Sequence, residues 1–299
     1  MPIACTESDP YLFADDGALF FSNIDRNNLS NVTKELKNIL RWMDANKLCV
    51  HLGKTNFVVF DKNESLDIIF IQRGGKTEHI KETKSIKYLG LIVDCCLAFK
   101  GHIGSILNKI TKKIGAMYRS KYLLPLRYRK MFANSLMLPH FDYLDIIYNK
   151  ASQYTLKKLD VVHRKIAKIA LDVKVTNNKK DTYVKMNWLP LQLRRQTHLA
   201  TIMFKVINGI APPSVYGLFN YCSGSRSSEQ CNLAIDSRAT TREFKHLGAK
   251  CWNDVPTSIR ESLNVNSFRK RYKSLLLETF KNKASYDYNN VFDSLLKIS

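Results

Sequence analysis

The pattern of apolar and polar residues changes near residue 98, from strand-like runs with one helix to a succession of helices. Two short apolar runs, at 11–13 and 18–21, are rich in aromatic residues and flank Ala14-Asp15-Asp16-Gly17. An Asp-Gly pair between apolar strands is a hairpin signal. The start of the chain is therefore expected to form a β-hairpin that turns at this pair.

The rest of the first third alternates helix and strand signals. Apolar residues recur at steps of three and four between 29 and 43, after the cap-competent Asn28 and Ser30, which predicts a helix that lies on a sheet. Apolar runs predict further strands at 57–60, 68–71 and 88–93, with Gly74-Gly75 as the turn between the last two. Residues 1–97 are therefore expected to form a small α+β unit.

Helical spacing dominates beyond residue 98. From Lys100 to Lys130 the chain carries nine Lys or Arg residues and no Asp or Glu, with apolar residues at helical steps, which predicts a basic amphipathic helix. Further helices are expected around 128–148, 155–171, 191–208 and 266–280, with breaks at 176–178 and 211–213 and a loop at 223–228. The predicted fold class is α+β, with a mainly helical region divided into a basic part at 98–175 and a C-terminal part at 176–299 that has a loop near 222–240.

The charge of the chain points to a polyanionic partner. Its 47 Lys+Arg against 26 Asp+Glu give the 299 residues a formal net charge of +21. Nucleic acid is favoured over a membrane, because no apolar run approaches the roughly 20 residues that span a bilayer. The N-terminus has no secretory pattern and seven scattered cysteines do not form a disulfide framework, so an intracellular location is expected.

Asp15 and Asp16 are the residues that most clearly indicate a metal-binding or catalytic site. Neighbouring carboxylates repel one another, and a divalent cation would relieve the repulsion. Mg²⁺ is usually held by one or two carboxylates plus substrate phosphates, as two-metal phosphoryl transfer requires. Asp-Asp-Gly turns also occur as solvated loops, so these residues alone leave both interpretations open.

Three segments in a fixed order extend this pattern. Phe13-Ala14-Asp15-Asp16 resembles the Tyr/Phe-x-Asp-Asp motif of reverse transcriptases, with phenylalanine in place of the more usual tyrosine. The segment 46–55, which ends in Lys54-Thr55, is similar to the next motif of that family, and Tyr88-Leu89-Gly90 to its Tyr-Leu-Gly strand. The chain thus resembles the C-terminal part of a non-LTR (LINE-type) retrotransposon reverse transcriptase, with a partial palm at 1–97 followed by a thumb and a downstream region.

The resemblance continues downstream and covers nearly the whole chain. It includes Trp188-Leu189-Pro190-Leu191, Arg194 and 204–212, and then 244–275 with Trp252-Asn253-Asp254-Val255-Pro256. These segments are similar to those of LINE-type elements rather than to retroviral polymerases.

The resemblance implies a set of site residues. Asp15 and Asp16 would bind Mg²⁺ beside the primer terminus, and Lys54 would lie near the incoming triphosphate unless it is only a solvated lysine at a strand end. Tyr88, Leu89 and Gly90 would help to grip the primer end. The implied partners are an RNA template and a DNA primer, the implied reaction is RNA-directed DNA synthesis, and the implied location is the nucleus.

The part of the family pattern that lies upstream of the Asp-Asp turn is not matched. In the family, the other essential carboxylate and the fingers lie upstream of the Asp-Asp turn, and only twelve residues precede Phe13 here. We therefore expect the chain by itself to lack polymerase activity. Two other hypotheses stay open: a non-catalytic nucleic-acid-binding remnant, and a helical protein-interaction scaffold with incidental charge.

The basic segment falls where the resemblance places a thumb-like element against the template–primer duplex. Its candidate phosphate contacts are Lys109, Lys112, Lys113, Arg119, Lys121, Arg127, Arg129 and Lys130. A charged helix face is most often only solvated, but the lack of any acid in the segment favours phosphate binding. A second basic cluster at 157–168 is tempered by Asp160 and Asp172.

Aromatic residues occur within and beside the basic segment. Tyr118, Tyr122 and Tyr128 could stack on bases, but aromatics at helical spacing more often pack in a core, and we expect these three to be core residues. Trp188 and Trp252 are likewise expected to be packing residues.

Overall fold

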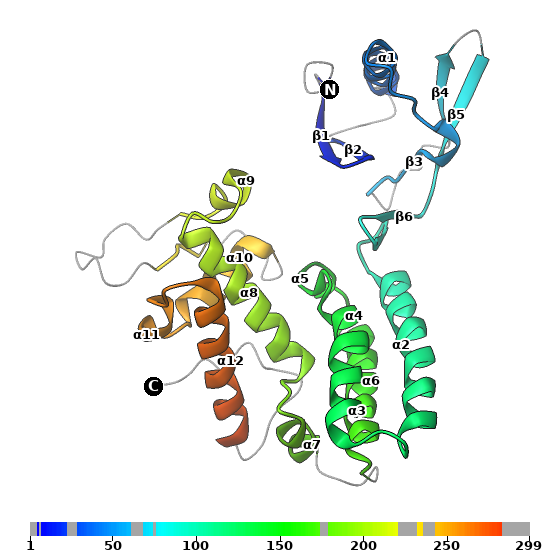
Figure 1. Cartoon of the computed structure of the whole chain (residues 1–299). Helices are drawn as coiled ribbons and strands as arrows, with labels where there is room; N and C mark the ends of the chain where they lie inside the picture. The colour runs from blue at the N-terminus through cyan, green and yellow to red at the C-terminus, as the bar shows by residue number, and fades with distance from the viewer. Residues whose placement is uncertain are drawn as a thin grey trace. The chain divides into compact units, whose positions relative to one another are not determined.

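The chain folds into two compact units, Met1–His102 and Ile103–Ser299, each with its own elements (Figure 1). The computed structural model describes residue 5 and residues 7–22, 29–60, 68–73, 76–173, 179–220, 232–235 and 243–282. The first unit mixes strands with one long helix, and the second is helical. The α+β class expected from the sequence is confirmed to the extent that the structure combines small sheets with helices.

The first unit consists of small sheets and a helix. Its elements are β1 (Ser8–Phe13), β2 (Asp16–Phe21), α1 (Leu29–Ala45), a 3-10 turn (Leu52–Lys54), β3 (Asn56–Phe57), β4 (Ile68–Arg73), β5 (Lys76–Glu82), β6 (Ser85–Tyr88) and β7 (Leu91–Asp94). β1 pairs with β2 and β6 with β7 as antiparallel hairpins. The three-stranded sheet has the order β3-β5-β4, in which β4 runs antiparallel and β3 parallel to β5.

The predicted helix of this unit is confirmed as α1, and its apolar face is buried. Val32 and Leu40 form a core cluster with Ile80 of β5, against which Phe21 and Phe57 also pack. Burying an aliphatic side chain of this size contributes about 1.5–3 kcal/mol relative to leaving it in water. The helix is therefore held against the strands by the stripe that the sequence pattern predicted.

A buried carboxylate attaches the first strand to this helix. Glu35 of α1 is only 2% exposed and accepts hydrogen bonds from the backbone N–H of Glu7 (2.6 Å) and of Ser8 (3.0 Å) and from the Ser8 hydroxyl. A buried carboxylate without such donors would be costly. Glu35 therefore fixes the start of β1, and with it the hairpin that carries Asp15.

The β1–β2 hairpin turns before the predicted Asp16-Gly17 pair, and the β6–β7 hairpin is not predicted by the sequence pattern. The first turns at Ala14-Asp15, where Ala14 has a φ of 53°, and Asp16 already belongs to β2 in register with Phe13. The single strand predicted at 88–93 is wrong, because Leu89 (φ 46°) and Gly90 (φ 82°) form a tight turn between β6 and β7. Positive φ at both central residues matches the twist of paired strands, and Gly adopts it without steric cost.

The other strand predictions are partly correct. A strand at 68–71 is confirmed within β4, whereas the strand predicted at 57–60 is reduced to β3 (Asn56–Phe57). The sequence pattern does not predict β5, a polar strand in which Ile80 is buried. The predicted turn at Gly74-Gly75 lies outside the described residues.

The second unit is a set of packed helices that begins within α2. Its elements are α2 (Lys100–Ser120), α3 (Leu126–Phe132), a π-helical turn (Ala133–Met137), α4 (Leu138–Asp142), α5 (Asp145–Tyr148), α6 (Gln153–Leu171), α7 (Lys179–Met186), α8 (Leu191–Ile207), α9 (Pro213–Tyr216), α10 (Phe244–Asn253), α11 (Thr257–Arg260) and α12 (Val265–Asn282). The helices predicted around 155–171, 191–208 and 266–280 are confirmed as α6, α8 and α12. The helix predicted around 128–148 is divided among four shorter elements.

The prediction of one basic helix from Lys100 to Lys130 is wrong, because α2 ends at Ser120. The backbone N–H groups of Leu123 and Leu124 donate to the Ser120 carbonyl, and the Ser120 hydroxyl donates to Ala116 O. Pro125, with ψ 155°, precedes α3. Proline has no N–H to continue a helix and disfavours the helical conformation in the residue before it, so a new helix begins after it.

A fully buried histidine packs among aromatic rings in the second unit. The His163 ring on α6 stacks between Tyr183 and Trp188, with centroid distances of 5.3 and 5.1 Å, and meets the edge of Phe141 at 5.4 Å. Its Nδ1 is 3.2 Å from the Tyr183 hydroxyl, and burial holds the pKa of His163 well below its ordinary value. The imidazole is therefore neutral and joins α6 to α7.

The expected packing roles of the two tryptophans are confirmed. Trp188 is 4% exposed, and its indole N–H donates to Asn134 Oδ1 at 2.9 Å. Trp252 is 2% exposed and stacks on Phe268 of α12. Both residues connect helices of the second unit.

We expect the free energy of unfolding to decrease as the pH falls below about 6.5. His163 stays neutral in the folded protein because its pKa is lowered well below 6.5, whereas the unfolded chain takes up this proton near its ordinary pKa. Stability is therefore lost by up to about 1.4 kcal/mol per pH unit until the pH reaches the folded pKa. Urea denaturation between about pH 5 and 7 measures this slope.

A His163→Phe variant is the control, since it keeps a ring in the stack and removes the titrating group. Its free energy of unfolding should depend less steeply on pH than that of the wild type. The slope should be smaller by up to about 1.4 kcal/mol per pH unit, the value for one proton. Equal slopes for the two proteins would show that His163 is not the source.

Candidate nucleic-acid interface

Asp15 and Asp16 are both exposed at the apex of the β1–β2 hairpin in the first unit. Asp15 lies in the turn and Asp16 opens β2. Lys54 is exposed at the end of the 3-10 turn, where its backbone N–H donates to His51 O at 2.9 Å. Within the described part of the chain, Lys54 makes no ion pair with either aspartate, so its role at a triphosphate stays a prediction.

The aspartate pair supplies only part of a metal site. Among the described residues, Asp15 and Asp16 belong to no group of three or more His, Cys, Asp or Glu side chains close enough to share an ion. Mg²⁺ is commonly held by one or two carboxylates together with substrate phosphates, so two exposed carboxylates fit that role. A two-metal centre needs further ligands than this pair provides.

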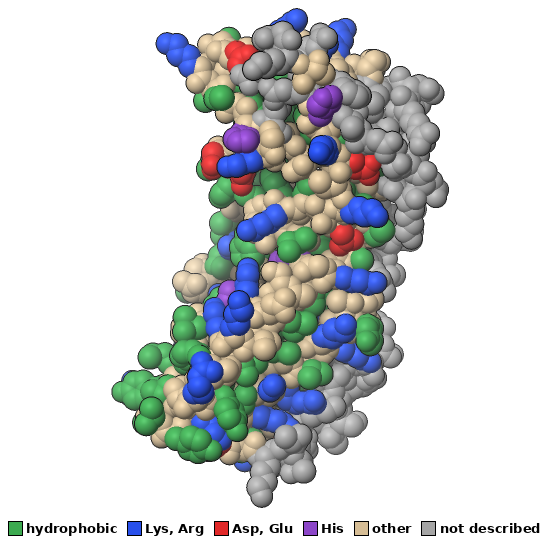
Figure 2. Space-filling model, turned by 90° about the vertical axis from the view of Figure 1, so that its right-hand side faces the viewer, with side chains coloured by type: hydrophobic (Ala, Val, Ile, Leu, Met, Phe, Trp, Pro, Cys, Tyr) green, Lys and Arg blue, Asp and Glu red, His purple; other side chains and the backbone are tan. Residues whose placement is uncertain are grey.

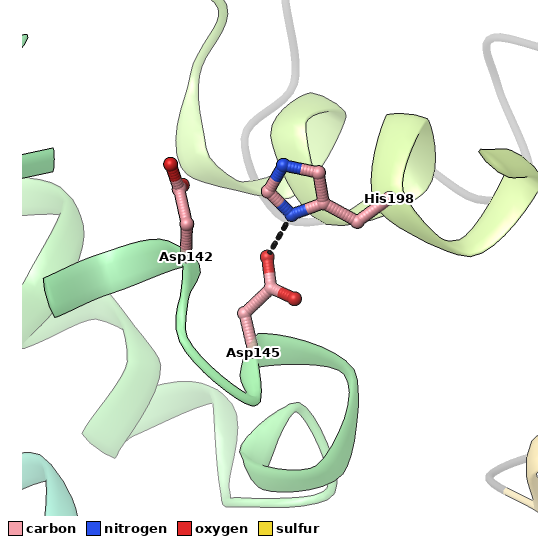
Figure 3. Close-up of side chains that lie close together, drawn as sticks. All are labelled: Asp142, Asp145 and His198. Carbon is pink, nitrogen blue, oxygen red and sulfur yellow. Dashed lines mark hydrogen bonds and ion pairs between the residues drawn. The ribbon is translucent and has the colours of Figure 1, made fainter. Parts of the chain in front are cut away.

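Asp142, Asp145 and His198 form such a group in the second unit, with ligand atoms all within 4.8 Å of one another (Figure 3). His198 Nδ1 on α8 lies 2.7 Å from Oδ2 of the buried Asp145 at the start of α5. Arg194, one turn earlier on α8, donates two hydrogen bonds to the Asp142 carboxylate, the one from Nε being 2.9 Å long. Because the guanidinium already neutralises Asp142, we interpret this network as a connection between α4, α5 and α8 rather than as a cation site.

No pattern in the sequence predicts this network. Asp142 and Asp145 lie about fifty positions before Arg194 and His198, and no local motif joins the two pairs. In the sequence, Arg194 is singled out only by the resemblance. The structure gives that residue a packing and electrostatic role.

Tyr88, Leu89 and Gly90 lie at the tip of the β6–β7 hairpin. The tyrosine and leucine are half-buried and Gly90 is exposed. At the end of β7, the Asp94 carboxylate accepts hydrogen bonds from the backbone N–H groups of Ala98 (2.9 Å) and Phe99 (2.6 Å). This hairpin therefore leads into α2 through an organised loop, and its contact with a primer stays a prediction.

Three of the eight candidate phosphate contacts are bonded inside the second unit, and a fourth, Arg129, is partly buried there. Lys113 Nζ donates to Leu136 O at 2.6 Å, and Lys130 Nζ to Lys185 O at 2.9 Å. Lys121 makes an ion pair with Asp172 at 2.7 Å, which raises the pKa of the lysine. Two guanidinium nitrogens of Arg129 are buried. These residues are poor candidates for binding an external phosphate.

The other four candidates are free to contact a ligand. Lys109, Lys112 and Arg119 on α2 and Arg127 on α3 are exposed, and none forms a hydrogen bond or ion pair with a described residue. Spacings of three and seven place the α2 members on one side of the helix. Figure 2 shows lysine and arginine side chains interspersed with hydrophobic ones on the face of the second unit that includes α2.

The expectation that the three tyrosines near the basic segment are core residues is wrong. Tyr118, Tyr122 and Tyr128 are 56%, 79% and 49% exposed. The buried face of α2 is made by the isoleucines and Met117, and the helix ends before Tyr122, so the apolar spacing does not continue. Exposed aromatic rings therefore lie beside exposed cations.

The second basic cluster lies on α6. Lys157, Lys158 and Lys165 are exposed, and Lys158 Nζ lies 4.8 Å from the ring centroid of Tyr154. Arg164 and Lys168 are half-buried. No hydrogen bond or ion pair ties the three exposed lysines to the described chain.

The segment 244–275, singled out by the resemblance, has a structural role in the second unit. The Asn253 side chain pairs with both the N–H and the C=O of Leu233, at 2.9 and 3.0 Å. Arg260 donates to the carbonyls of Val255 (2.8 Å) and Asn253 (2.7 Å). These residues therefore hold backbone segments together and are not available to a ligand.

Comparison with protein-family models, with curated proteins and with solved structures found no match for this chain. Within the described residues, no helix combines the length and the apolarity that crossing a bilayer requires.

Proposed function

We propose that the chain binds nucleic acid through phosphate contacts made by Lys109, Lys112, Arg119 and Arg127. The observation that carries this proposal is that these four cations are exposed and without a described internal partner, in a segment that has no acid. Such contacts provide affinity that is independent of base sequence. The formal net charge of +21 adds long-range attraction to a polyanion.

We further propose that this binding belongs to a protein related to LINE-type reverse transcriptases. The ligands would then be an RNA template and a DNA primer in the nucleus, and Asp15 and Asp16 would hold Mg²⁺ beside the primer end. The order of the three motifs supports this proposal, as does the exposure of both aspartates at a hairpin apex. RNA-directed DNA synthesis is the reaction that the complete family site performs.

A non-catalytic nucleic-acid-binding protein is the second candidate. It is favoured by the isolation of Asp15 and Asp16 from other potential metal ligands among the described residues. Binding through the four cations needs no metal ion. The two candidates therefore share the interface and differ at the aspartates.

We expect the affinity for duplex DNA to fall with log salt at a slope of about −3.6, the value for four phosphate contacts. Replacing Lys109 and Lys112 by glutamine should reduce this slope by about 2. Fluorescence anisotropy with a labelled blunt duplex at several salt concentrations measures both values.

The matched control is a Lys270→Gln/Lys281→Gln variant, which removes two exposed lysines from α12 and changes the net charge equally. Its slope should stay that of the wild type. A wild-type slope near zero, or equal losses in the two variants, would contradict the proposed interface.

The purified chain should show no primer extension with Mg²⁺ and deoxynucleotides, because two carboxylates do not complete a two-metal centre. Detectable extension would contradict this expectation.

An Asp15→Ala variant, tested in the presence of Mg²⁺, separates the two candidate functions. Weaker binding of a template–primer than by the wild type supports the reverse-transcriptase relationship, and unchanged binding supports the non-catalytic candidate.

A further inference from the structure

We propose that Tyr118 and Tyr122, at the end of α2, form a platform on which the unpaired bases of a single-stranded nucleic acid stack. This inference rests on the proposed function and adds the kind of strand that is bound. Both rings are exposed, at 56% and 79%, and neither packs on another described aromatic ring. Each tyrosine therefore has ring surface that is accessible to a planar ligand.

One ammonium group holds the two rings in place. Lys121 Nζ lies 5.0 Å from the ring centroid of Tyr118 and 4.5 Å from that of Tyr122. The same nitrogen is 2.7 Å from Oδ1 of Asp172, the residue that caps α6. Cation–π attraction to a lysine that is itself fixed by an ion pair restricts both rings, so a base that stacks on them costs less side-chain entropy.

The surrounding charge fits a polyanionic strand. Arg119 and Arg127 are exposed close to the tyrosines in the sequence and can bind phosphates while bases lie on the rings. A second copy of this chain would instead bring another +21 of formal charge to the same surface. Charge complementarity therefore favours nucleic acid over self-association.

The exposed rings favour a single strand over a duplex. In a duplex the base faces are covered by their neighbours, and only base edges, sugars and phosphates are accessible. Unpaired bases present a π-face to an aromatic side chain whatever their sequence. The cations of α2 would bind either form, whereas the tyrosines discriminate between them.

The test compares three labelled ligands by fluorescence anisotropy of the full chain at one salt concentration. They are an oligothymidylate of about 20 nucleotides, an abasic strand of the same length and a blunt duplex. The wild type should bind the oligothymidylate about tenfold or more tighter than the abasic strand. A Tyr118→Leu/Tyr122→Leu variant should lose that preference and keep its affinity for the abasic strand and the duplex.

Tyr154→Leu is the matched control, because Tyr154 is 73% exposed on α6 and also lies against a lysine. It should bind all three ligands like the wild type. Thermal unfolding should show that the substituted proteins are folded, since the Lys121–Asp172 pair is retained in each.

Three outcomes would overturn the inference. In the first, the double variant binds oligothymidylate like the wild type. In the second, it loses equal affinity for all three ligands. It could also sediment as a monomer where the wild type is a dimer, with strand affinity unchanged, which would make the platform a self-association surface. If the duplex still binds with the expected salt dependence, the proposed function survives this failure, whereas a wild type that binds none of the ligands refutes both.

Discussion

The segment from Lys100 to Lys130 imposes the main electrostatic constraint on the second unit, because its nine cations have no acid among them. Any carboxylate that pairs with these cations must therefore come from another part of the chain or from a ligand. Lys121 finds Asp172 at the end of α6, while Lys113 and Lys130 use backbone carbonyls of the π-helical turn and of α7. These three contacts connect the basic segment to the helices around it and leave a smaller set of cations facing solvent.

Apolar periodicity predicted the helices that bury one face. α1, α6, α8 and α12 were expected because each repeats apolar residues at steps of three and four, and each has buried members. α7 was missed because Lys179–Met186 is mostly polar, although Tyr183 and Met186 are buried. β5 was missed for the same reason, since Lys76–Glu82 shows little apolar alternation and its place depends on pairing with β4.

The candidate site was predictable only in its composition. The sequence places Asp15 and Asp16 in a hairpin and gathers the cations in one segment, and the structure exposes both aspartates. The sequence alone does not distinguish Lys109, which is exposed, from Lys113, which is bonded internally. The carbonyl that accepts the hydrogen bond from Lys113 lies 23 residues away. Tyr118 is exposed because Met117 and the isoleucines make the buried face of α2. The exposure of Tyr122 could not be predicted, because only Pro125, five residues after Ser120, indicates that α2 ends there.

The hydrogen bonds from the start of β1 to Glu35 connect the β1–β2 hairpin to α1, two elements that no sequence pattern connects. One side chain on α1 sets where the β1–β2 hairpin begins, and the apex with Asp15 and Asp16 lies at the far end of the same short strand. A shift of α1 along its own axis would therefore carry the acidic apex with it. The packing of an amphipathic helix thus controls the position of the two carboxylates, although the helix itself contributes no residue to the candidate site.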